Sequence, residues 1–71
     1  MNVETINMLY KDYLYCLDEV QEQLKVLAAK KPGTIRAARK TLEMIYRQTE
    51  QIRTALIALG YMPTRGTLMR L

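Results

Sequence analysis

The 71-residue sequence contains no histidine, no serine and only one cysteine. Without histidine or serine it cannot assemble a Ser-His-Asp or Cys-His nucleophilic site. One cysteine cannot close an internal disulfide, and a zinc site of the common mixed Cys/His kind is excluded as well. We therefore predict that the protein is not an enzyme and that it holds no metal ion, no other cofactor and no small-molecule substrate.

Glycine and proline are scarce, with three and two residues, and neither tryptophan nor phenylalanine occurs. So few turn residues argue against an all-β fold and against a disordered linker. No apolar run approaches the roughly 20 residues that a membrane-spanning helix needs, so we expect no membrane association. The first residues lack the basic start of a secretory signal, and a lone Cys16 suits a reducing compartment. A cytoplasmic location is the resulting expectation.

Residues 3–30 repeat apolar side chains at helical spacing. Ile6, Tyr13, Val20 and Leu27 recur every seven residues, and Leu9, Cys16, Tyr10, Leu17 and Leu24 lie beside them. Pro32 and Gly33 follow as the first strong helix breakers. The pattern predicts a helix over about 3–30 and a turn at 31–34, after which Thr34 can cap a second helix.

The second helix is predicted over about 35–59, with a stricter apolar pattern. Its apolar positions, together with Thr49, alternate spacings of three and four residues and form a coiled-coil seam. They are Ile35, Ala38, Leu42, Ile45, Thr49, Ile52, Leu56 and Leu59. Gly60 suits the left-handed position that ends a helix. The fold class is therefore all-α: an antiparallel, coiled-coil-like two-helix hairpin over residues 1–61, followed by a tail over 62–71.

Two helices cover each other on one side only, and a chain this short buries only about 60% of its unfolded surface. Apolar side chains off the seam would remain partly exposed. We therefore expect two hairpins to pair as a homodimeric four-helix bundle, unless the chain docks onto a different protein or its tail folds back.

The tail is basic and apolar, with a turn-like stretch from Pro63 to Gly66. One interpretation is that it covers an exposed patch around Met8, Leu14 and Tyr15. A second is that patch and tail together bind a protein partner, and a third is that the tail is a frayed end. The predicted partner-binding residues are Met8, Leu14, Tyr15, Ile57, Tyr61, Met62, Leu68 and Met69.

Positive charge is concentrated in the second half of the chain. The net charge of +4 divides into −1 for residues 1–31 and +5 for residues 32–71. Off the second seam lies a basic set with one aromatic side chain, a combination that suits phosphate contact and base stacking. Its members are Arg36, Arg39, Lys40, Tyr46, Arg47 and Arg53. This basic set has three interpretations: an ordinary solvated face, contact with nucleic acid, or contact with an acidic protein partner.

These features favour a non-enzymatic protein–protein interaction module. It would be a small adaptor, regulator or inhibitor that docks a helix face onto a larger macromolecule. Its size is typical of the accessory proteins of phages and mobile elements. One alternative is a dimeric RNA- or DNA-binding regulator that uses the basic face of the second helix. The other is a structural subunit of a larger assembly.

Overall fold

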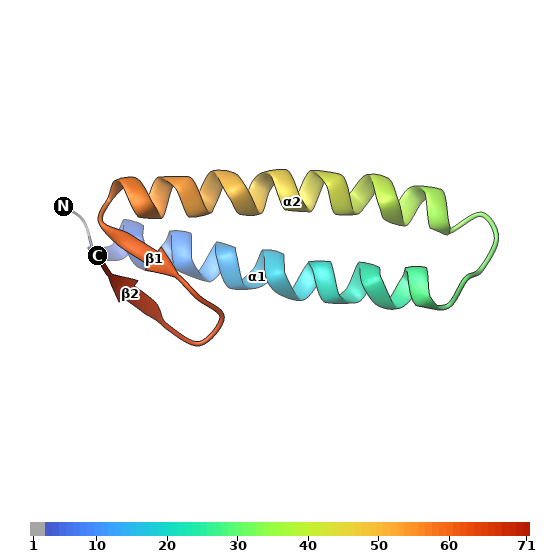
Figure 1. Ribbon diagram of the computed structural model, residues 1–71, viewed down its shortest axis with the longest axis horizontal. Helices are drawn as coiled ribbons and strands as arrows, with labels where there is room; N and C mark the ends of the chain where they lie inside the picture. Colours follow the sequence, from blue (N-terminus) through green and yellow to red (C-terminus); the bar gives the residue numbers. More distant parts are fainter. Residues whose placement is uncertain (1–2) are drawn as a thin grey trace.

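A computed structural model describes residues 3–71 of the chain and shows two long helices that pack side by side. Helix α1 spans Val3–Ala28 and helix α2 spans Ile35–Ala58. They run antiparallel along a molecule of 47 × 19 × 18 Å (Figure 1). The predicted helical hairpin is confirmed. α1 ends two residues before, and α2 one residue before, the ends we predicted.

The reversal between the helices uses two residues in the left-handed backbone region. Lys30 has a φ of 52° and Gly33 a φ of 88°. Glycine adopts such angles without strain, whereas a lysine does so at a cost. Thr34 stands at the N-cap of α2, but its hydroxyl donates to the carbonyl of Lys31 at 2.8 Å and makes no cap hydrogen bond. Thr34 is thus the N-cap residue, as predicted, but its side chain caps no amide of α2.

Helix α2 ends as its sequence predicts, at a left-handed glycine. Gly60 has a φ of 95°. Its amide donates to the carbonyl of Ile57 at 2.9 Å, and the amide of Leu59 is shared between the carbonyls of Ala55 and Leu56. These short-range bonds satisfy the last carbonyls of the helix and turn the chain back toward α1.

The core lies along the line where the two apolar seams meet. Leu56 is fully buried, and the other buried apolar side chains come from both helices. The set comprises Ile6, Cys16, Ala38, Leu42, Ile45 and Leu56. Thr49, the polar member of the seam, donates its hydroxyl to the carbonyl of Ile45 at 2.7 Å and so needs no partner on α1. Together with the buried Pro63 of the tail, these six side chains form a small core in residues 3–71.

The tail forms a β-hairpin, which the sequence did not predict. Strand β1 spans Tyr61–Pro63 and strand β2 spans Leu68–Arg70, paired antiparallel with Met62 opposite Met69. Thr64 and Thr67 close the turn through their backbone and hydroxyl groups. The turn expected between Pro63 and Gly66 is thus present, with a short strand on each side.

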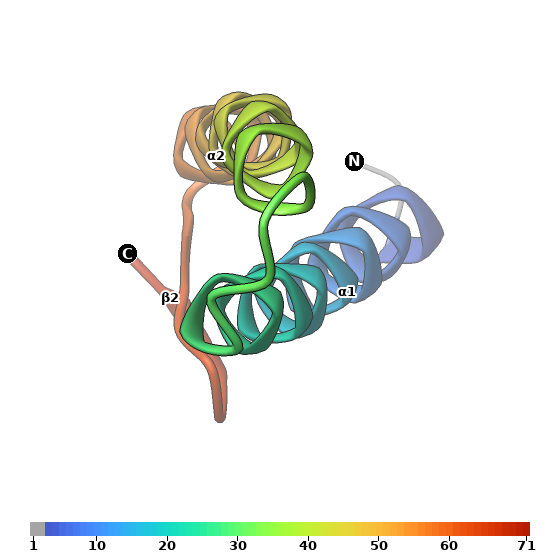
Figure 2. The same cartoon turned by 90° about the vertical axis from the view of Figure 1, so that its right-hand side faces the viewer.

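This β-hairpin lies along one side of α1 (Figure 2). The hydroxyl of Tyr10 donates to the carbonyl of Thr64 at 2.9 Å, and Arg65 pairs with Asp18 at 3.8 Å. Pro63 is buried. Tyr10 and Asp18 are about 12 Å apart along the helix axis, so the tail covers roughly two turns of α1 on that side.

Candidate protein interface

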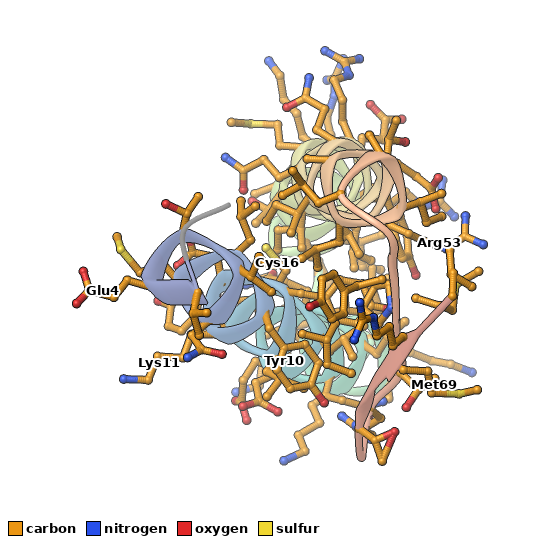
Figure 3. All side chains as sticks on the ribbon, turned by 90° about the vertical axis from the view of Figure 1, so that its left-hand side faces the viewer. Glu4, Tyr10, Lys11, Cys16, Arg53 and Met69 are labelled. Carbon is orange, nitrogen blue, oxygen red and sulfur yellow. The ribbon has the colours of Figure 1, made fainter. Side chains whose placement is uncertain are left out.

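The side of the helix pair away from the tail retains large exposed apolar side chains. Met8, Tyr15 and Met44 are 65%, 66% and 60% exposed. Met8 and Tyr15 are seven residues apart on α1 and therefore lie on one stripe of that helix. Figure 3 shows the tail, with Met69, on the opposite side of the molecule from the outward-pointing Glu4 of α1.

A groove between α1 and α2 runs beside Tyr15. Its lining residues come from both helices: Asp12, Tyr15, Cys16, Gln48, Gln51 and Ile52. Because residues near 15 face residues near 50, positions whose numbers add up to about 65 lie level across the hairpin. Met44 lies one turn from Gln48 on the same stripe of α2. We call the surface formed by Met8, Tyr15, Met44 and this groove the open face.

The two helices contribute different chemistry to the open face. On α2 the stripe carries no charge and consists of small, apolar and amide side chains at spacings of four and three. Its members are Ala37, Thr41, Met44, Gln48, Gln51 and Ala55. On α1 the stripe combines Met8 and Tyr15 with the carboxylates of Asp12 and Glu19. Gln48 and Gln51 were missed by the sequence analysis, although their uncharged stripe could have indicated them.

The predicted partner-binding residues divide between two surfaces. Met8 and Tyr15 lie on the open face, while Met69 is exposed on β2. The remaining five, Leu14, Ile57, Tyr61, Met62 and Leu68, are half-buried. The interpretation in which the tail covers Met8 and Tyr15 is wrong, because the tail docks beside Tyr10 and Asp18 instead. Tyr10 lies about 140° around the helix from Tyr15, which explains the difference.

The predicted basic set is also divided around α2. Arg39, Tyr46 and Arg53 recur every seven residues and therefore share one stripe, which Figure 3 places on the tail side at Arg53. Arg53 is half-buried and pairs with Glu50 at 3.6 Å, and Tyr46 is 50% exposed. Arg36, Lys40 and Arg47 form a second, exposed stripe.

Cys16, at the side of the groove, is 7% exposed and unpaired. Within residues 3–71 no cluster of acidic or cysteine side chains is placed to hold a metal ion. Neither helix of the described chain combines the length and apolar character needed to cross a membrane. The open face thus combines exposed apolar side chains with amides and two carboxylates, a mixed composition that is common at protein interfaces.

No protein-family model, curated protein or solved structure matches this chain.

Proposed function

We propose that the protein is a non-enzymatic interaction module of the cytoplasm that docks its open face onto the complementary helix face of a protein partner. The observation that carries this proposal is the exposure of Met8, Tyr15 and Met44 on one face. Exposed apolar side chains that gather on one face point to an interaction site more strongly than ones scattered singly over the surface.

Tyr15 is suited to anchor such a contact. It stands near the middle of α1 and borders the groove, so a partner side chain inserted there would cover both its ring and the wall formed by Gln48 and Gln51. Tyrosine is enriched among the residues that dominate binding energies at protein interfaces. Methionine, as in Met8 and Met44, adapts its shape to the surface that it meets.

A photo-cross-linking amino acid at position 15 tests this proposal directly. In cells that produce the protein, we expect a cross-linker at Tyr15 to give protein adducts, identified by mass spectrometry after nuclease treatment. The matched control carries the same amino acid at Glu43, which is exposed on α2 outside the open face. Equal adduct yields at positions 15 and 43, or adducts to nucleic acid alone, would refute the docking role.

One observation favours a second function, the binding of RNA or DNA. Within residues 3–71, Arg36, Arg39, Lys40 and Arg47 are exposed and none of them forms an ion pair. Such cations are free to contact phosphates. If the protein binds nucleic acid, its affinity should fall steeply as the salt concentration rises. Arg39→Ala and Arg47→Ala should each lower the slope of log affinity against log salt concentration by about one. Salt-independent binding would contradict this second function.

A further inference from the structure

We infer that the open face binds a second copy of this chain, with α1 of each copy packed against α2 of the other. This inference rests on the proposed function, because it names the partner of the same surface. The result is a four-helix bundle in which every helix has antiparallel neighbours. Its two-fold axis runs parallel to the helices.

The opposite charges of the two helices favour this arrangement. Helix α1 carries two lysines and five acidic residues, a net charge of −3. Helix α2 carries five basic and two acidic residues, a net charge of +3. The central stripe of α2 on this face is uncharged, but the exposed Arg36, Lys40 and Arg47 border it. Packing α1, which carries Asp12 and Glu19 on the face, against α2 of the second copy therefore places negative charge beside positive charge. The other two-fold arrangement would place α1 on α1 and α2 on α2, with like charges facing each other.

The sizes of the side chains on the open face point the same way. A two-fold axis parallel to the helices preserves the height of every residue along the bundle. Met8 of one copy then lies level with Ala55 of the other. Val26, which is 37% exposed and lies on the same stripe of α1 as Met8, is level with Ala37, so large side chains meet small ones. Tyr15 lies level with Gln48 and Gln51 of the second copy. Interlocking of large and small residues is how helix bundles fill their cores.

Glu19 on the open face and Arg47 at its border are matched in height and sign across the two copies. Glu19 of α1 lies level with Arg47 of the second copy, within about one residue of helical rise. Within residues 3–71 of one chain, neither side chain has an ion-pair partner. The pairing of two chains would supply one to each of them, twice per dimer.

Cysteine mapping distinguishes the two arrangements. Cys16→Ala removes the native thiol. In that background, Tyr15→Cys and Gln51→Cys are made as separate single-cysteine proteins and then mixed. A mass tag on one of them distinguishes the mixed disulfide from the self-linked products. Both new cysteines stand at exposed positions. A disulfide forms only between residues whose Cα atoms lie about 4.4–6.8 Å apart. On mild oxidation we expect the mixed disulfide to exceed either self-linked product severalfold.

The competing arrangement gives the opposite result. Residue 15 stands at the middle of α1, so in an antiparallel α1-on-α1 pair the two copies of residue 15 would meet at the axis. Tyr15→Cys would then link to itself, which would overturn the inference. The oligomeric state is measured in parallel by sedimentation equilibrium of the unmodified chain, which should give twice the chain mass.

Failure of this inference and failure of the proposed function give different results. A chain that sediments as a monomer at all concentrations overturns the self-pairing, while protein adducts at position 15 in cells would still support docking onto a different protein. A dimer that cross-links at neither position places the interface elsewhere and also overturns the inference. Circular dichroism confirms that each cysteine variant keeps the helical content of the Cys16→Ala protein.

Discussion

The hydroxyl of Tyr10 donates a 2.9 Å hydrogen bond to the backbone carbonyl of Thr64, which lies 54 positions further along the chain. This bond joins the first half of α1 to the turn between β1 and β2. Together with the ion pair between Arg65 and Asp18, it holds the tail on one side of the helix pair. The open face is exposed because the tail is held on the side of Tyr10 and not on the side of Tyr15.

Removing this hydroxyl should loosen the tail. We expect Tyr10→Phe to lower the free energy of unfolding by about 1 kcal/mol, because the part-buried carbonyl of Thr64 loses its donor. Chemical denaturation measures the loss, and amide hydrogen exchange at Thr64 should quicken. Tyr46→Phe is the control, since that side chain is 50% exposed, lies outside the open face and should change stability little. Equal effects of the two changes would show that the bond contributes nothing.

The turn between the helices offers a stabilising change. Lys30 holds a φ of 52°, a conformation that a lysine adopts at a cost and a glycine adopts freely. We expect Lys30→Gly to raise the free energy of unfolding by a net of roughly 0.5–1 kcal/mol, because the relief of backbone strain exceeds the cost of ordering glycine, which is more flexible in the unfolded chain. Lys31→Gly is the matched control, because Lys31 lacks a positive φ. It should be neutral or destabilising, and a gain at both positions would argue against a strained Lys30.

Leu56 should be the most sensitive position of the core. Its side chain is 0% exposed, so Leu56→Ala removes buried methyl groups and leaves a cavity. Such changes cost about 2–5 kcal/mol, a large share of the stability of so small a domain. Thermal unfolding at a fixed protein concentration should show a much lower midpoint. Leu71→Ala, at a position that is 67% exposed, should leave the midpoint within a few degrees of the original.

The helices were predictable because their signals are local and repeated. Each seam recurs over several turns, and Gly33 and Gly60 mark positions that only a left-handed backbone explains. The strands were not predictable, because three residues are too few to show an alternating pattern. Their pairing depends on the turn between Thr64 and Thr67 and on docking against Tyr10, which are contacts distant from the periodic part of the sequence.

The candidate interface was predictable in part. Met8 and Tyr15 lie off the seam, and that alone indicated exposure. Their grouping with Leu14 and the tail failed because helix geometry places Leu14 between Tyr10 and Asp18, the two residues that hold the tail. The groove was missed because Gln48 and Gln51 have no distinctive chemistry of their own. Only the position of α1 beside them makes the groove.

Reversing the charges of Glu19 and Arg47 tests the arrangement of the proposed dimer without cysteines. In Glu19→Lys alone, each new lysine would face Arg47 of the second copy, and in Arg47→Glu alone, Glu19 would face a glutamate. Each variant should therefore raise the dimer dissociation constant roughly 3–10-fold, since two attractive pairs per dimer become repulsive.

Mixing the two charge-reversed variants should restore the affinity. In the mixed dimer, Lys at 19 faces Glu at 47 and the native Arg47 faces the native Glu19, so both pairs again join unlike charges. Sedimentation or fluorescence exchange should find the heterodimer favoured over either homodimer. The preference should diminish in high salt, because dissolved ions screen the attraction to the exposed side chain at position 47. The control mixes a Lys40→Glu variant with an Asp18→Lys variant. Asp18 lies on the tail side with Arg65 and does not face the second copy, so mixing these two variants should restore nothing. Two outcomes would show that α1 and α2 do not face each other across a two-fold axis. One is that mixing the control variants restores the affinity, and the other is that mixing the Glu19 and Arg47 variants fails to restore it.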